Sequence, residues 1–199
     1  MKKIIERVKQ IVFKPRETWE TISTEEATIP GLLKDYLLLL AAIPALASFL
    51  GRWIVGIRIP FSGVYRFTLG ASLVTSIVSY LLTIVSVWVL AKVISYLAPN
   101  FGSVKDDVKG FKVAVTTYTP VLAAGILYLI PSLGILVFIA GLYGLYLLYM
   151  GLPIVMNTPK EKALPYTIVT VVAVILIYLI VGWVSSAILS AYGPHLPRI

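Results

Sequence analysis

Five long apolar stretches dominate the sequence, and each has about the length needed to cross a lipid bilayer. They cover about residues 35–53, 69–98, 113–130, 133–156 and 166–188. About 20 apolar residues form a helix that crosses the hydrocarbon core of a bilayer. A chain of 199 residues could not bury five such stretches in a soluble core. The sequence therefore predicts an all-α integral membrane protein, a bundle of about five transmembrane helices preceded by a cytoplasmic amphipathic helix.

The overall composition agrees with this fold class. The chain is 59% hydrophobic and only 13% charged, whereas a soluble domain is about 45–50% apolar and about 25% charged. We expect a cytoplasmic N-terminal segment over residues 1–30, one transmembrane domain over residues 31–192, and an external tail over residues 193–199.

The first residues have the pattern of an amphipathic helix. Lysine, arginine and glutamate side chains alternate there with apolar ones that fall on one helical face, and Trp19 is an apolar anchor in the polar stretch that follows. Such a face is suited to the membrane surface or to a docked partner. We predict a cytoplasmic docking segment built on Ile4, Ile5, Val8, Ile11, Val12 and Trp19.

The basic residues predict the orientation of the chain in the membrane. With the N-terminus inside, 12 of the 17 Lys and Arg residues fall on the cytoplasmic side. Cytoplasmic loops of membrane proteins carry such an excess of positive charge. We therefore predict a multi-pass protein of the cell membrane with its N-terminus inside and its C-terminus outside.

A stripe of hydroxyl groups follows the second apolar stretch at helical spacing. It consists of Ser72, Ser76, Ser79, Thr83 and Ser86. Small residues let helices approach closely, and their hydroxyls can bond across the contact. We interpret the stripe as a helix-packing seam, and the alternative is the polar wall of a pathway.

A second polar group lies where the third and fourth stretches are joined by a very short turn. Pro120 removes a backbone hydrogen bond from its helix, and neighbouring hydroxyls can satisfy the freed carbonyl. The group consists of Thr116, Thr117, Tyr118, Thr119, Pro120, Tyr143, Tyr146 and Tyr149. It predicts either an internally satisfied kink or a small hydrated cavity.

The sequence offers little to catalysis or metal binding. It has no cysteine, one histidine (His195), and no acidic residue inside an apolar stretch, the first of which begins at Asp35. Nucleophile, zinc-protease, P-loop and dinucleotide motifs are missing. We expect no enzyme activity, cofactor, metal or nucleic acid. The expected partners are the lipid bilayer with its anionic lipids, a membrane or cytoplasmic protein, and a second copy of the chain.

The scarcity of amides suggests a heat-adapted source. Asn100, Asn157 and Gln10 are the only side-chain amides in the chain, which is the bias reported for thermophilic proteins. This hypothesis predicts a melting midpoint above the range of about 45–65 °C typical of mesophilic domains, and a midpoint near about 45 °C would contradict it.

Several segments together resemble prokaryotic members of the Yip family, the Ypt/Rab-interacting five-pass membrane proteins. They are IVFKPRETWETI from Ile11, AIPALA from Ala42, Tyr118-Thr119-Pro120, YLLYMGLP from Tyr146 and TPKEKA from Thr158. The resemblance implies five spans, a cytosolic N-terminus and no catalytic residues. The eukaryotic members bind prenylated Rab-type GTPases and one another in vesicle traffic. This chain lacks the long polar N-terminal region typical of them, so the resemblance does not carry Rab binding over to it.

These observations favour a non-enzymatic scaffold or adaptor in membrane organisation, because the distinctive polar residues gather on the predicted cytoplasmic side. The alternative is a transporter or binder of a small neutral molecule or lipid, with a cavity near Thr116, Thr119, Tyr146 and Tyr149.

Overall fold

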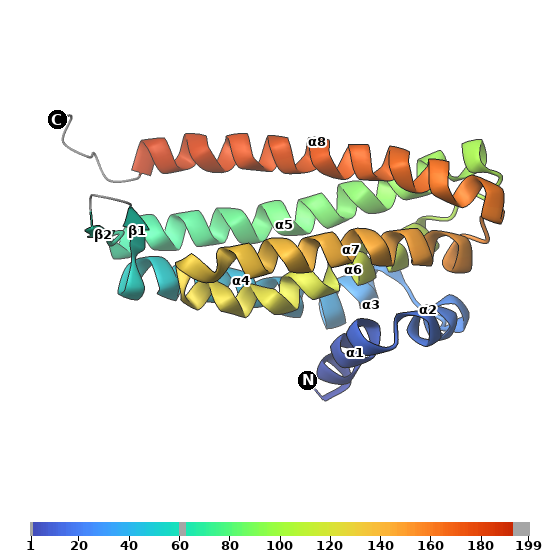
Figure 1. Ribbon diagram of the computed structural model, residues 1–199, viewed down its shortest axis with the longest axis horizontal. Helices are drawn as coiled ribbons and strands as arrows, with labels where there is room; N and C mark the ends of the chain where they lie inside the picture. The colour runs from blue at the N-terminus through green and yellow to red at the C-terminus, as the bar shows by residue number, and fades with distance from the viewer. Residues whose placement is uncertain (1, 60–62, 193–199) are drawn as a thin grey trace.

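The computed structural model describes residues 2–59 and 63–192, and within these ranges the chain is almost entirely helical (Figure 1). Two short helices come first: α1 (Lys2–Phe13) and α2 (Pro15–Thr24). The predicted external tail over residues 193–199, with His195, lies outside the described residues.

Within the described ranges, five helical segments are long and apolar enough to cross a membrane, which confirms the predicted all-α membrane fold. The first runs from Ile29 to Val55 and combines α3 (Ile29–Leu32), α4 (Leu38–Leu50) and two π-helical turns, Leu33–Leu37 and Gly51–Val55. The others are built on α5 (Leu69–Leu97), α6 (Asp107–Ala124), α7 (Gly134–Val155) and α8 (Lys160–Tyr192). Short 3-10 segments extend or join them at Ala98–Phe101, Gly125–Leu129 and Pro131–Leu133.

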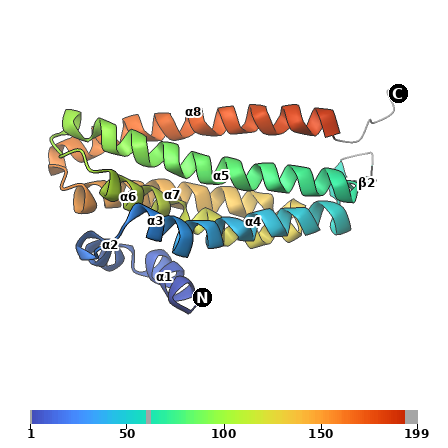
Figure 2. The ribbon, with the colours of Figure 1, turned by 180° about the vertical axis from the view of Figure 1, so that it is seen from behind.

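The long helices form an antiparallel bundle in which α6 is the most buried (Figures 1 and 2). Helix α6 contacts both α5 and α7, and α8 packs on α5 and α7. Asp106 starts α6 by accepting hydrogen bonds from the amides of Val108 and Lys109, each at 2.9 Å. Such an aspartate satisfies amides that have no partner inside the helix.

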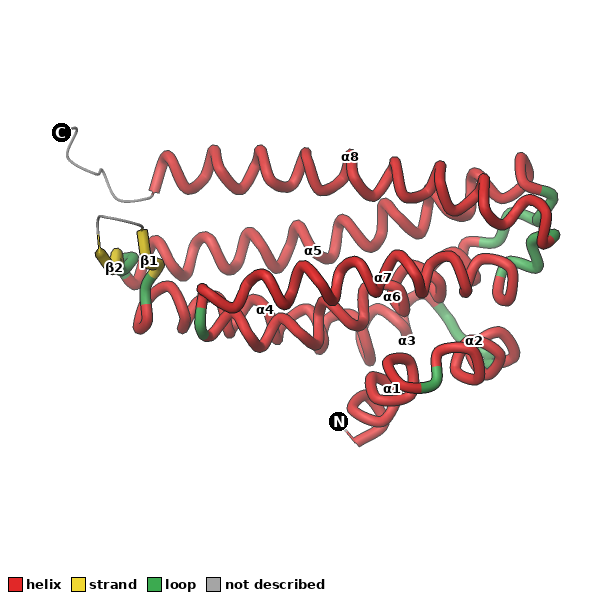
Figure 3. Tube along the Cα trace, in the orientation of Figure 1, coloured by secondary structure: helices red, strands yellow, loops and turns green. Residues whose placement is uncertain are grey.

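The two ends of the bundle differ. At one end, α1 and α2 lie across the side of the long helices (Figure 3), and α1 contacts α6 while α2 contacts α7. The other end carries a small antiparallel hairpin of β1 (Ile57–Ile59) and β2 (Gly63–Tyr65), with Ile57 opposite Tyr65. We call these the α1–α2 end and the hairpin end.

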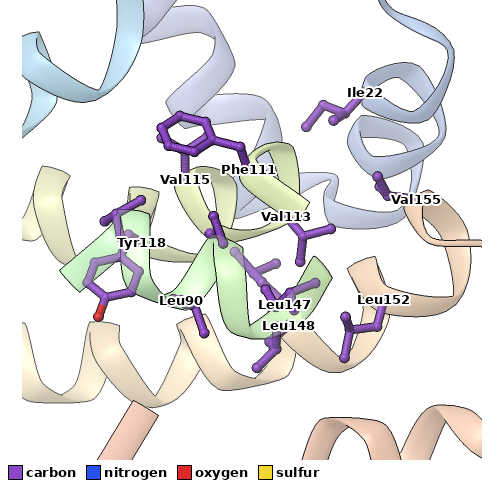
Figure 4. Packing of buried hydrophobic residues seen from close by; sticks show 14 of the residues in the cluster. Ile22, Leu90, Phe111, Val113, Val115, Tyr118, Leu147, Leu148, Leu152 and Val155 are labelled. Atoms are coloured by element: carbon purple, nitrogen blue, oxygen red, sulfur yellow. The ribbon is translucent and has the colours of Figure 1, made fainter. Parts of the chain in front are cut away.

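A hydrophobic core runs through the bundle toward the α1–α2 end. It includes Leu90 of α5, Phe111 and Val115 of α6, and Leu147 and Leu148 of α7 (Figure 4). The same cluster includes Ile11, Trp19 and Ile22 from the two short helices. Helices α1 and α2 are therefore part of the folded unit.

The outer surface of the bundle is strongly apolar. Large exposed side chains include Ile77, Leu81 and Trp88 of α5, Phe138, Ile139 and Leu142 of α7, and Leu176, Leu179, Ile180 and Trp183 of α8. Apolar patches of this extent are unfavourable in water and are the normal surface of a helix that faces lipid.

Candidate functional site

The side chain of Trp19 holds α2 against α7. It is fully buried, and its ring lies over Gly151, where an added Cβ would be 2.5 Å from Cζ2 of the indole. The indole nitrogen makes no hydrogen bond to the described residues, so apolar packing carries this contact. Burying a tryptophan removes about 150–250 Å² from water, which contributes roughly 4–6 kcal/mol before entropic costs.

Lys112 of α6 secures the end of α2. Its ammonium group is buried and donates hydrogen bonds to the carbonyl oxygens of Ile22, at 3.0 Å, and Glu25. These carbonyls lie at the C-terminus of a helix, where a cation is favourable. Arg7 of α1 also pairs with the Glu25 side chain at 2.5 Å. The junction between α1, α2 and α6 is thus fixed by charge as well as by packing.

Tyr143 of α7 links α1 to the bundle. Its hydroxyl lies 2.9 Å from the carbonyl oxygen of Val12 and 3.3 Å from that of Ile11, and donates to both as a shared bond. Sequence reasoning placed Tyr143 in the kink group, but the structure places it against the N-terminal helix.

The six predicted docking residues differ in how far they are exposed in the structure. Ile11 and Trp19 are buried within the chain, and Ile4, Val8 and Val12 are partly buried against the core. Only Ile5 is largely exposed, at 57%. The apolar face of α1 therefore packs on the protein's own helices.

A different surface of the N-terminal pair remains accessible. Ile5, Lys9 and Phe13 follow one another at a spacing of four residues, and all three are exposed; Phe13 is 80% exposed. The exposed basic residues Lys14 and Arg16 follow directly. We call these five residues the outer face of α1–α2.

The structure does not gather the predicted kink group into one cavity. The hydroxyl of Thr119 donates its one proton to the carbonyl oxygen of Val115, at 3.0 Å. It therefore accepts the hydrogen bond from the hydroxyl of Tyr36, which is also 3.0 Å away. Thr116 and Pro120 are buried elsewhere on α6. Tyr146 and Tyr149 are about half exposed, since the buried face of α7 follows Gly144, Leu147, Leu148, Gly151 and Leu152.

Two members of the group, Thr117 and Tyr118, do line a cavity. It has a volume of about 580 Å³, lies between α6, α7 and α8, and is otherwise mostly apolar. The ring of Tyr178 stacks on that of Tyr118 with centroids 6.3 Å apart. The hydroxyls of Thr117 and Tyr118 have no hydrogen-bond partner of normal geometry in the part of the chain that the structure describes. Cavities of this size and character are typical of ligand pockets.

The hydroxyl stripe of α5 serves two environments. Ser72, Ser76 and Ser86 are buried, and the Ser76 hydroxyl lies 3.4 Å from that of Ser48 on α4. Ser79 and Thr83 instead line a small polar pocket.

Sequence reasoning missed Lys112, Tyr36 and Tyr178. Lys112 is one of the 12 basic residues expected on the cytoplasmic side, and nothing in its local sequence marks it as buried. The described residues hold no cluster of three or more His, Cys, Asp or Glu side chains that could bind a metal.

Comparison with known proteins gives one family model and two curated relatives. A sequence model described as the Yip1 domain matches residues 9–183. The chain is also 26% identical, over 92% of its length and 94% of the relative, to the inner membrane protein YohC of Escherichia coli K12, and equally to YohC of a second strain, O6:H1. No solved structure is significantly similar to it.

Proposed function

The chain belongs to the Yip1 domain family, and from that premise we propose that it is a non-enzymatic scaffold or adaptor in the cell membrane. The family match and the YohC relative support a multi-pass membrane protein. In our proposal the N-terminus lies in the cytoplasm, because the basic residues cluster at the α1–α2 end.

The observation that carries this proposal is the rigid attachment of α1 and α2. Trp19, Lys112 and Tyr143 hold the pair in one orientation on α6 and α7. Phe13 is nevertheless 80% exposed at the junction between the two helices. A surface fixed in advance loses little conformational entropy when a partner binds. The outer face of α1–α2 would bind a partner protein through an apolar patch that covers Ile5 and Phe13.

The test is co-purification from the native membrane under gentle extraction, with bound proteins identified and quantified by mass spectrometry. We compare the wild type with the double variant Ile5→Ser and Phe13→Ser. The matched control is Val104→Ser, because Val104 is 81% exposed in the loop before α6, at the same end of the bundle.

We expect a stoichiometric protein partner that the wild type and the Val104 variant retain and the double variant loses. Correct folding of the double variant is checked by its melting midpoint. A partner retained equally by all three proteins would refute the outer face of α1–α2 as the docking surface.

The 580 Å³ cavity favours a second candidate function, the binding or transport of a small neutral molecule or a lipid. The neutral hydroxyls of Thr117 and Tyr118 are the polar groups that would orient such a ligand. A ligand that co-purifies with the wild type and is lost in Gly141→Phe, which fills the cavity wall, would support this function. A wild type that retains no such ligand would count against it.

A further inference from the structure

A small polar pocket lies inside the helix bundle near the hairpin end. It has a volume of about 270 Å³, and its walls come from α4, α5, α8, the π-helical turn Gly51–Val55 and the 3-10 segment Gly125–Leu129. The polar lining includes Ser48, Arg52, Ser79, Thr83, Tyr128 and Ser185. The pocket therefore presents one guanidinium group among several hydroxyls.

The positive charge in this pocket has no counter-charge among the residues that the structure describes. The Nη1 atom of Arg52 is buried and makes no hydrogen bond to the described residues. The nine acidic residues lie at positions 6–35, 106–107 and 161, all at the other end of the bundle. Arg52 as a whole is partly exposed, but a buried part of a charged group without a partner is still unfavourable. Arginine inside a membrane segment normally pairs with another group or with a ligand.

The backbone directs Arg52 into the bundle. It lies in the π-helical turn that ends the first span, and its carbonyl accepts a hydrogen bond of 3.2 Å from the amide of Phe67. Side chains on a helix lean toward its N-terminus, so a residue at this end reaches back toward the middle of the bundle. Single π-helical turns in a helix often occur at functional sites.

The hydroxyls differ in whether their protons are available. Ser48 donates to the carbonyl of Ala45 at 3.0 Å, and Thr83 donates to that of Ser79 at 2.8 Å. The hydroxyls of Ser79, Tyr128 and Ser185 donate to no residue in the ranges that the structure describes. Three free O–H donors thus accompany the guanidinium of Arg52, and no carboxylate shares the pocket.

We propose that this pocket binds the phosphate group of an anionic ligand, with Arg52 as the cationic anchor and Ser79, Tyr128 and Ser185 as hydrogen-bond donors. Arginine binds phosphate oxygens through paired, charge-assisted hydrogen bonds. The volume of about 270 Å³ is well above the roughly 10–15 Å³ that a single water molecule needs on the same measure. It admits a phosphate or a small headgroup but not acyl chains. The ligand is either free inorganic phosphate or the headgroup of an anionic phospholipid, and this inference does not depend on the adaptor function.

The first arm of the test uses inorganic phosphate. The full-length protein is purified in dodecyl maltoside, a detergent without phosphate, and its melting midpoint is followed as phosphate replaces chloride at constant ionic strength. A ligand that binds the folded state raises the midpoint as its concentration rises. The shift should disappear in Arg52→Gln and persist in Arg66→Gln, since Arg66 is exposed at the same end.

The second arm uses lipid. Phosphatidylglycerol or phosphatidylcholine is added to the same preparations, and bound lipid is measured by native mass spectrometry. If the headgroup is the ligand, the wild type and the Arg66 variant retain one phosphatidylglycerol that the Arg52 variant binds at least tenfold more weakly, as expected for a charge-assisted bond.

A response to phosphate alone identifies the free ion, and retention of phosphatidylglycerol alone identifies the headgroup. No response in either arm, or equal binding by the Arg52 variant, overturns the proposal. If Arg52→Gln fails to fold, Tyr128→Phe replaces it and should weaken binding about threefold to tenfold through loss of one donor. Unchanged binding in a folded Tyr128 variant would then overturn the proposal.

Discussion

At the scale of single residues, Trp19 and Gly151 decide how the N-terminal pair is attached. The indole ring occupies a notch on α7 that has no side chain at its base, and any Cβ there would overlap the ring. The same helix carries Gly141, where an added Cβ would meet nothing within 4 Å. Gly151 therefore leaves room for the ring of Trp19, whereas Gly141 borders open space.

We expect Gly151→Ala to displace Trp19 and to lower the stability of the protein by about 1–3 kcal/mol, the usual effect of overpacking a filled core. Thermal unfolding in detergent measures this effect. Gly141→Ala is the control and should leave the midpoint unchanged or raise it slightly, because alanine favours a helix. Equal melting midpoints of the two variants would contradict the close contact between Trp19 and Gly151.

Lys112 is the second decisive residue, because two backbone carbonyls depend on its ammonium group. We expect Lys112→Met to weaken the attachment of α2 by about 1.5–3 kcal/mol, since a buried charged donor is lost. Faster hydrogen–deuterium exchange at the amides of α2 would report this. Lys160→Met should exchange like the wild type, because Lys160 is exposed and makes no ion pair with the described residues. Unchanged hydrogen–deuterium exchange at the α2 amides of the Lys112 variant would refute the role of this contact.

At the scale of helices, the contact between α4 and α5 depends on small hydroxyl residues. Ser76 of α5 is 5% exposed and lies against Ser48 of α4. The two helices are therefore close together at these two residues. Gly125 makes a similar close approach, because a Cβ there would lie 2.5 Å from the Cβ of Pro44. The first span is thus held between α5 and the end of α6 by residues with little or no side chain.

We expect Ser76→Leu to separate α4 from α5 and to lower stability by about 1–3 kcal/mol. Ser186→Leu is the matched control, because Ser186 is exposed on α8 and would add only lipid-facing surface. The midpoints of the two variants and their oligomeric state in detergent test the seam. An unchanged midpoint in the Ser76 variant would contradict close packing at this position.

The sequence predicts helices better than it predicts contacts between them. Composition and apolar length are properties of each stretch, so five spans follow from the sequence alone. Which face of α7 is buried depends on its neighbours. Tyr143, Tyr146 and Tyr149 are equivalent in local sequence, yet Tyr143 bonds to α1 while Tyr146 and Tyr149 are half exposed.

Burial of charge was also hard to predict. Lys112 and Arg52 both lie near helix ends, where long side chains normally extend to water. The structure instead places the Lys112 ammonium group on two carbonyls and buries Nη1 of Arg52 in the polar pocket. Their roles follow from long-range contacts, which no local pattern in this sequence indicates.

At the scale of the whole molecule, a five-span bundle of the Yip1 domain family carries the N-terminal pair α1 and α2 fixed at one end. The Trp19 contact and the Lys112 bonds make the pair part of the fold. A docking role requires that this end faces the cytoplasm.

The most direct test of this account is the side of the membrane on which the α1–α2 end lies. The chain has no cysteine, so Phe13→Cys and Arg66→Cys each introduce a single thiol at an exposed position on opposite ends of the bundle. Both variants are treated in intact cells with a maleimide that does not cross the membrane. We expect labelling at position 66 in intact cells and at position 13 only after permeabilisation. Labelling of position 13 in intact cells would contradict the account.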